Sequence, residues 1–339
     1  MKKIVTLCGG GSLGHVLAGW LSARGHAEVN ILTSRPEKWQ RTIEIDTPDG
    51  LILRGQITKV SNKPEEVIPQ SDIVLLCLPG FMICKQLESI KHVLAPSTFV
   101  GSVFCSTGFF FDALKILGTQ QPMWGFQRVP FISRVNEYGK SAHLLGYKDA
   151  HNVAVENVNE KQKCDFTTLL TEWFERPIKL LKNYYEASLT NSNPLLHTSR
   201  LYTMFGGDNE GKIFDRMIFF YEEWTEEAAD MYIKMDTEFF NLLKSLPVSD
   251  GYLPSVLEYY ESHDAKSLAK KLSSIQGFKG ITSPMKQVDG GWVPDFESRY
   301  FTEDFPHGLK HIWQLAHEKS IPCPNIDLVY EWGMSKINR

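Results

Sequence analysis

The feature that most constrains the fold is a glycine-rich turn directly after the first apolar run. Residues 4–8 have the composition of a buried strand, and residues 15–23 carry an apolar face at helical spacing. Between a strand and a helix, a G-x-G-x-x-G turn is the fingerprint of a dinucleotide-binding crevice, because its glycines permit a tight turn, close approach to a pyrophosphate and close helix packing. We therefore predict a dinucleotide site over Gly9, Gly10, Gly11, Ser12, Leu13 and Gly14.

The first part of the chain alternates strand-like and helix-like segments, which is typical of βαβ units. Residues 42–60 alternate apolar and polar side chains around Pro48-Asp49-Gly50, which indicates a hairpin added to the sheet. We expect a Rossmann-type, doubly wound α/β domain over residues 1–182. Its strands are predicted at residues 4–8, 27–33, 72–78, 98–105, 122–127, 142–147 and 152–155, and its helices at residues 81–94 and 109–117.

The pattern changes after Lys182, where strand-like runs become nearly absent. We expect an all-α C-terminal domain over residues 183–339 and an active site between the two domains. Aromatic runs such as Phe219-Phe220-Tyr221 recur at helical spacing, which favours core packing over a binding face. Helices are predicted at residues 184–191, 195–204, 217–246, 252–262, 265–275, 304–320 and 327–337.

Composition argues against several classes of partner. The formal net charge of −4 over 339 residues, without a basic cluster, gives no electrostatic case for nucleic-acid binding. The longest apolar run, residues 73–84, is interrupted at Pro79-Gly80 and is too short to cross a bilayer. The first residues resemble no cleavable signal. We expect a soluble cytoplasmic protein, monomeric or homodimeric, that acts on small molecules and binds neither nucleic acid nor membrane.

Metal-ligand patterns are weak. The six cysteines are scattered and form no C-x-x-C pair, which favours reduced thiols over disulfides or a zinc site. His307 and His311 have the i, i+4 spacing of a metal pair, but no third ligand is evident. We expect no metal.

The end of the second predicted strand bears on the choice of cofactor. NAD-specific folds commonly place an acidic residue there, whereas an arginine accommodates the 2′-phosphate of NADP. Here the strand runs into Ser34 and Arg35, which offer a hydrogen-bond donor and a planar cation for phosphate. An ordinary solvated arginine would fit as well, so NADP(H) is favoured and NAD(H) stays open. Leu78 and Pro79, where the strand at residues 72–78 ends, are also assigned to the cofactor site.

Three polar residues in the helical half are candidates for chemistry: His197, Arg299 and Asp304. His197 follows an Asn-Pro step that favours a helix start, and histidine exchanges protons near neutral pH. A lone histidine, an arginine on a loop and an acidic residue at a helix start are all common without any function. Residue types alone therefore leave structural roles open for all three.

A resemblance to a known family strengthens the case for these residues. Residues 288–304, Val-Asp-Gly-Gly-Trp-Val-Pro-Asp-Phe-Glu-Ser-Arg-Tyr-Phe-Thr-Glu-Asp, resemble the signature segment of the opine dehydrogenases, the octopine/nopaline dehydrogenase family. Residues 278–281, 284–286 and 193–197 resemble the same family, and the similarity extends over nearly the whole chain. The resemblance implies a catalytic dyad of His197 and Asp304, with Arg299 binding a substrate carboxylate.

The family reaction gives each residue type a task. A 2-oxo acid condenses with the amino group of an amino acid, and a nicotinamide hydride reduces the resulting imine. His197 is expected to exchange the proton, and Asp304 to fix the tautomer of its ring. Gln127 lies in the stretch that lines the amino-substrate pocket, where arginine-using relatives carry an acidic residue. This difference disfavours arginine as amino substrate, and the nearby Arg128 suits an acidic or neutral amino acid better.

Two alternatives stay open at this point. One is a related two-domain dehydrogenase that reduces a 2-oxo acid, or oxidises a hydroxy acid, without an amine. The other is a sensor that binds NAD(P) and does not turn over.

Overall fold

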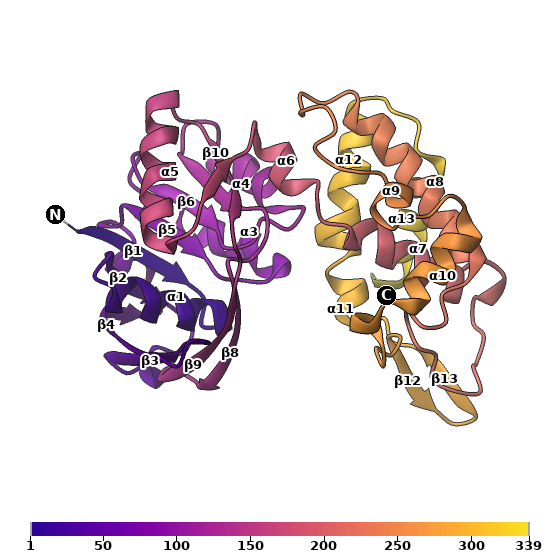
Figure 1. Cartoon of the computed structure of the whole chain (residues 1–339), viewed down its shortest axis with the longest axis horizontal. Coiled ribbons are helices and arrows are strands. Elements are labelled where there is room, and N and C mark those ends of the chain that lie inside the picture. Colours follow the sequence, from indigo (N-terminus) through magenta and orange to yellow (C-terminus); the bar gives the residue numbers. More distant parts are fainter. Residues whose placement is uncertain (1, 338–339) are drawn as a thin grey trace. The chain divides into compact units, whose positions relative to one another are not determined.

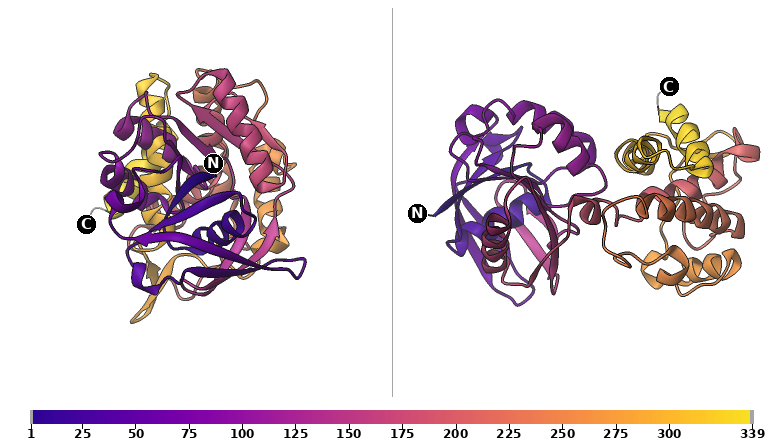
Figure 2. Two further views of the ribbon diagram at one scale, coloured as in Figure 1. Left: turned by 90° about the vertical axis from the view of Figure 1, so that its left-hand side faces the viewer. Right: turned by 90° about the horizontal axis from the view of Figure 1, so that it is seen from above.

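A computed structural model describes residues 2–337 and divides the chain into two compact units, with the division after Ser188 (Figures 1 and 2). The sequence pattern places the change of character a few residues earlier, after Lys182. Each unit has its own secondary structure and its own core. None of the helices in residues 2–337 combines the length and the apolar composition needed to cross a bilayer.

The first unit is built on one sheet of eleven strands, in the order β11-β10-β7-β6-β5-β1-β2-β4-β3-β9-β8. Its centre, from β7 to β2, is parallel as predicted. Parallel strands are buried on both faces, and the side chains of β1 alternate accordingly: Leu7 belongs to one core cluster and Cys8 to the other. The strands are β1 (Lys3–Cys8), β2 (Ala27–Leu32), β3 (Thr42–Asp46), β4 (Ile52–Ser61), β5 (Ile73–Leu76), β6 (Phe99–Ser102), β7 (Met123–Phe126), β8 (Phe131–Glu137), β9 (Ser141–Tyr147), β10 (His151–Glu156) and β11 (Ile178–Leu180).

The predicted hairpin at residues 42–60 is present as β3 and β4, and it extends the sheet. β4 pairs in parallel with β2, and β3 pairs in parallel with β9. The strands β8 and β11 and the helices α2 and α5 were not predicted. α5 begins with a capping box in which Asn159 and Gln162 satisfy each other's backbone N–H groups. The helices of this unit are α1 (Ser12–Ala23), α2 (Pro64–Val67), α3 (Gly80–Ile90), α4 (Phe109–Leu117), α5 (Glu160–Phe174) and α6 (Tyr184–Ser188).

The second unit is helical except for one hairpin, which projects from it in Figure 1. The hairpin consists of β12 (Met285–Val288) and β13 (Gly291–Pro294), joined by Asp289-Gly290 with Gly290 at φ +88°. Of the two turn residues only Gly290 has positive φ, which glycine adopts without a steric penalty, so Asp-Gly between short strands is a strong hairpin signal. The helices are α7 (Asn193–Phe205), α8 (Glu226–Leu243), α9 (Val256–Tyr259), α10 (Ala265–Ser274), α11 (Arg299–Thr302), α12 (Lys310–Glu318) and α13 (Pro324–Ile337).

Three predicted helices in this unit were too long. The helix predicted at residues 252–262 is limited to α9, residues Val256–Tyr259. The helix predicted at residues 217–246 begins only at Glu226, where the Thr225 hydroxyl accepts a hydrogen bond from the N–H of Ala228 and caps α8. The helix predicted at residues 304–320 begins only at Lys310, as α12. A π-helical turn (Phe305–Leu309) takes the place of its predicted start, and in this turn the Leu309 N–H donates to the Asp304 carbonyl at 2.7 Å. π-helical turns are rare and are frequently found at functional sites.

Candidate functional site

The first unit contains a groove of about 520 Å³ at the carboxyl ends of β1, β2 and β5. Ligands of doubly wound sheets bind at this edge. Six of the residues predicted to bind a cofactor line the groove, namely Gly9, Gly10, Gly11, Ser34, Arg35 and Leu78.

The glycines of the turn are required for two different reasons. Gly9 has φ +118°, and a Cβ there would lie 2.6 Å from the Cys77 carbonyl oxygen, whereas a Cβ on Gly14 would lie 2.5 Å from the Gly9 carbonyl oxygen. Both positions therefore need glycine for the chain to pack. A Cβ on Gly11 would meet no protein atom within 4 Å. The backbone at Gly11 faces open space, which is what close approach of a ligand to that backbone requires.

The remaining predicted cofactor residues lie beside the groove. Ser12 accepts a hydrogen bond from the N–H of Val135, at 3.2 Å, and ties the first turn of α1 to β8. Leu13 packs against the core, and Pro79 precedes the first turn of α3.

A buried histidine that the pattern analysis did not single out fixes the glycine turn. The N–H of Gly139 donates to Nε2 of His15 at 2.7 Å, so Nδ1 carries the ring proton and donates to the Gly11 carbonyl at 2.9 Å. Burial lowers the pKa of His15, which favours this neutral form. The ring therefore orients the Gly11 peptide.

The groove has a positive lining. Its residues, all in the described part of the chain, include Arg35 and Lys85 and no Asp or Glu. The Arg35 guanidinium lies over the ring of Tyr138, 4.1 Å from its centroid, and the Tyr138 hydroxyl is 3.2 Å from the Thr33 hydroxyl. A guanidinium stacked on an aromatic ring keeps its hydrogen-bond donors available at the ring's edge.

The second unit brings together the predicted His197 and Asp304. The π-helical turn after Asp304 approaches the start of α7 so closely that a Cβ on Gly308 would lie 2.7 Å from Cγ of Pro194. On its other side, the buried ring of Phe305 occupies the space that a Cβ on Gly333 of α13 would need. Two close approaches, each dependent on a glycine, therefore place Asp304 beside α7.

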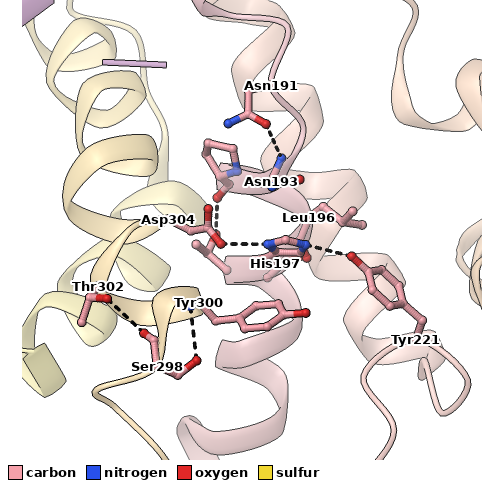
Figure 3. A network of polar contacts seen from close by, with 12 residues as sticks. Asn191, Asn193, Leu196, His197, Tyr221, Ser298, Tyr300, Thr302 and Asp304 are labelled. Atoms are coloured by element: carbon pink, nitrogen blue, oxygen red, sulfur yellow. Dashed lines mark hydrogen bonds and ion pairs between the residues drawn. The ribbon is translucent and has the colours of Figure 1, made fainter. Parts of the chain in front are cut away.

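Nδ1 of His197 lies 2.8 Å from Oδ2 of Asp304, and the two side chains are 11% and 15% exposed (Figure 3). A carboxylate only accepts hydrogen bonds, so Nδ1 carries a proton and donates it to Asp304. In the neutral ring Nε2 is then unprotonated. The pair has the geometry in which a carboxylate orients a histidine that exchanges protons through its other nitrogen.

A third residue completes this cluster. The hydroxyl of Tyr221 lies 2.8 Å from Nε2 of His197, so the phenol donates to the unprotonated nitrogen. The prediction that the Phe219-Phe220-Tyr221 run serves core packing is incomplete, because Tyr221 also carries this polar contact. Periodicity could not show it, because residues 217–224 are not helical.

Buried Arg200 holds the segment that carries Tyr221. It lies one turn after His197 on α7 and donates to the carbonyls of Glu223, at 2.6 Å, and Phe220, at 3.3 Å. Burial lowers its pKa to about 10, which still leaves it charged at neutral pH. The spacing of three residues between His197 and Arg200 is the one sequence signal that could have linked them.

The other two predicted substrate residues lie apart from these contacts. Arg299 is the first residue of α11 and is exposed, while the next residue, Tyr300, places its ring 4.8 Å from that of His197. Gln127, in the first unit, accepts a hydrogen bond from the Asn152 amide and donates to the Glu186 carbonyl, both at 2.9 Å. The Gln127 amide thus connects β10 to α6.

Comparisons with known proteins address the family. Residues 180–337 match the model described as NAD/NADP octopine/nopaline dehydrogenase, alpha-helical domain. Tauropine dehydrogenase of Arabella iricolor is 30% identical over 366 residues, which cover 99% of this chain and 92% of the relative. The chain belongs to the opine dehydrogenase family. It is an NAD(P)-dependent dehydrogenase.

Solved structures support the fold of this opine dehydrogenase. Octopine dehydrogenase with NADH and L-arginine superposes with a TM-score of 0.84 at 24% identity, covering 99% of this chain and 90% of that one. Yersinopine dehydrogenase with NADP+ gives a TM-score of 0.75 at 13% identity, covering 99% and 91%. Both predicted classes, a Rossmann-type domain and a helical domain, are confirmed. The two structures hold different nicotinamide cofactors, so the fold does not decide between them.

Proposed function

We propose that this opine dehydrogenase joins a 2-oxo acid to the amino group of an amino acid and reduces the resulting imine to a secondary amine at the expense of NAD(P)H. The observation that carries the proposal is the His197–Asp304 pair, in a chain whose first unit has a glycine-lined groove with a cationic lining. The reaction draws on both units, because the groove accounts for the hydride donor and the pair for the proton.

The groove fits a nicotinamide dinucleotide. The open space at Gly11 and the first N–H groups of α1 suit a pyrophosphate, since a helix N-terminus attracts negative charge. Ser34 and Arg35 would hold the ribose end, and Leu78 the apolar side. When bound, the cofactor supplies the hydride that reduces the imine carbon.

His197 would exchange the proton of the reaction. Condensation of amine and ketone expels water, which needs a proton on the departing hydroxyl, and the reverse oxidation needs a base for the amine proton. Asp304 would hold the imidazole in the tautomer that serves both and stabilise the imidazolium that forms. Oriented groups of this kind contribute about 10²- to 10⁴-fold.

Arg299 would bind a substrate carboxylate. Its exposed guanidinium has no hydrogen bond or ion pair with another side chain in residues 2–337, so its planar fork is available to a ligand. We retain Gln127 as a residue of the amino-substrate region, and we propose that an acidic or neutral amino acid is used rather than arginine.

The reaction is tested by a matrix of 2-oxo acids against amino acids with both reduced cofactors. Oxidation of NADPH or NADH that requires both organic substrates, with formation of a secondary amine detected by mass spectrometry, is the expected outcome. Oxidation at full rate with the oxo acid alone would instead indicate a 2-oxo acid reductase. Cofactor binding with no turnover across the matrix would indicate a sensor.

We further propose a preference for NADP(H), supported by Arg35 and Lys85 and by the lack of a carboxylate in the groove lining. Loss of an arginine–phosphate contact costs about 1.5–3 kcal/mol. Arg35→Ala should therefore raise the KM for NADPH by about 10- to 100-fold and leave the KM for NADH nearly unchanged. Arg54→Ala, which removes an exposed cation outside the groove, is the control. An unchanged KM for NADPH in Arg35→Ala would contradict the assignment.

A further inference from the structure

Both ring nitrogens of His197 are occupied by protein groups. Nδ1 donates to Asp304 and Nε2 accepts from Tyr221, each at 2.8 Å. A histidine in this state offers no free nitrogen to a substrate. Direct proton exchange at Nε2 would require the Tyr221 hydroxyl to move away first.

Tyr221 is held in place on several sides. Its ring is stacked on Phe278, with centroids 4.1 Å apart and planes at 21°, and lies nearly parallel to Trp224 at 5.9 Å. The residue is 5% exposed, and Arg200 binds the backbone carbonyls on both sides of it. Swinging the phenol away would break the hydrogen bond to His197 and the stacking on Phe278 together.

We propose that Tyr221 relays the proton between the substrate and His197. In the oxidative direction, the substrate N–H bond breaks and its proton goes to the phenol oxygen of Tyr221. At the same time the original phenol O–H bond breaks and the phenol proton goes to Nε2 of His197. In the reductive direction, imidazolium Nε2 returns a proton to the phenol oxygen while the phenol proton goes to the departing hydroxyl. One proton crosses, no electrons are transferred in the relay, and Tyr221 ends unchanged.

Electrostatics favour a concerted relay over a phenolate intermediate. Burial, together with Tyr300, Tyr260 and Asp304, raises the pKa of Tyr221 well above its usual value. A free phenolate would therefore be costly, which favours transfer of both protons in one step. Two charged side chains flank the relay: Asp304 binds Nδ1 of His197, and Arg200 binds the backbone of the segment that carries Tyr221.

The relay rests on the proposed reaction and is tested with Tyr221→Phe, which keeps the stacked ring and removes only the hydroxyl. We expect kcat to fall about 10- to 100-fold, since one relay step is lost. The Kd for NADPH should stay within twofold and the melting temperature close to wild type. Tyr330→Phe, which removes the phenol of a half-buried tyrosine of the same unit whose ring is stacked on Trp313, is the matched control and should retain kcat.

The pH profile and the solvent isotope effect separate a relay from a structural role. A two-proton relay predicts a curved proton inventory for wild-type kcat in H₂O–D₂O mixtures and a linear one for Tyr221→Phe. A difluorotyrosine at position 221 has a more acidic hydroxyl and nearly the same shape. It should recover the turnover lost in Tyr221→Phe, with a shifted pH profile of kcat. Wild-type kcat in folded Tyr221→Phe would overturn the relay while leaving the proposed reaction intact. Failure of the wild-type enzyme to turn over would instead sink the reaction itself.

Discussion

The groove of the first unit and the His197 cluster of the second are built in opposite ways. The groove is lined by the glycine turn and by short segments that follow the strands of one sheet, together with side chains of α3. The cluster is made of side chains from a helix, an irregular segment and a π-helical turn. The groove can be predicted from local sequence motifs, whereas the His197 cluster depends on how distant segments pack.

The difference also concerns charge. The groove is lined by the cations of Arg35 and Lys85, and the proposed binding of a dinucleotide there needs no change of protonation. The cluster places His197 between a carboxylate and a phenol, and the proposed reaction would change its protonation state. Binding and proton transfer are therefore separable by mutation.

The largest effect is expected from His197→Ala. Without the ring, turnover should fall by about 10² to 10⁴, because general acid–base catalysis contributes that much. The Kd for NADPH, measured by fluorescence titration, should change less than twofold, because the groove lies wholly in the first unit. A parallel loss of cofactor affinity would break the separation between the two sites.

Two buried groups, one in each unit, are expected to respond to acid with opposite signs. In the first unit, burial lowers the pKa of His151 from 6.5 to about 4. Between these values the unfolded chain binds a proton that the folded chain does not, so the free energy of unfolding decreases as pH falls, by about 3 kcal/mol in all. In the second unit, burial raises the pKa of Asp236 from 3.8 to about 6. There the folded chain binds the extra proton, so the free energy of unfolding decreases by about 3 kcal/mol as pH rises.

Calorimetry of two variants tests this contrast. His151→Phe should gain most in melting temperature relative to wild type below pH 5, and Asp236→Asn should gain most above pH 7. Variants that gain equally at both pH values would show that these two groups do not set the pH response.

A matched pair of glycine variants sharpens the account of the groove. Gly14→Ala places a methyl group 2.5 Å from a carbonyl oxygen and should lower stability by about 1–3 kcal/mol. Gly11→Ala meets no protein atom, so the melting temperature of the cofactor-free protein should be nearly unchanged while NADPH binds about tenfold more weakly. Unchanged affinity in Gly11→Ala would place the pyrophosphate elsewhere.

The sequence was informative where short-range rules apply. The glycine turn and the Pro48-Asp49-Gly50 hairpin were predicted because each depends on neighbours in the chain, and the parallel core followed from the alternation of strand-like and helix-like segments. Helix bounds failed where tertiary contacts override propensity. Residues 217–224 are apolar enough for a helix, yet Arg200 binds the carbonyls of Phe220 and Glu223 and keeps the segment irregular.

The second site was predictable only in part. His197 and Asp304 were named through the family resemblance, and no spacing rule could show that they touch. Tyr221 was missed because the sequence of an apolar run does not show whether a tyrosine hydroxyl within it makes a hydrogen bond. His15 was missed for the converse reason, since its task is to hold a backbone peptide rather than a ligand.

The contact between Phe305 and Gly333 has a consequence for the order in which the enzyme becomes competent during synthesis. The strands and the glycine turn of the groove leave the ribosome early, and His197 follows, but the helix that supports Asp304 is translated long afterwards. On the proposed function, a nascent chain would complete its dinucleotide groove before the His197–Asp304 pair forms. Chains that end before α13 should bind the reduced cofactor without oxidising it.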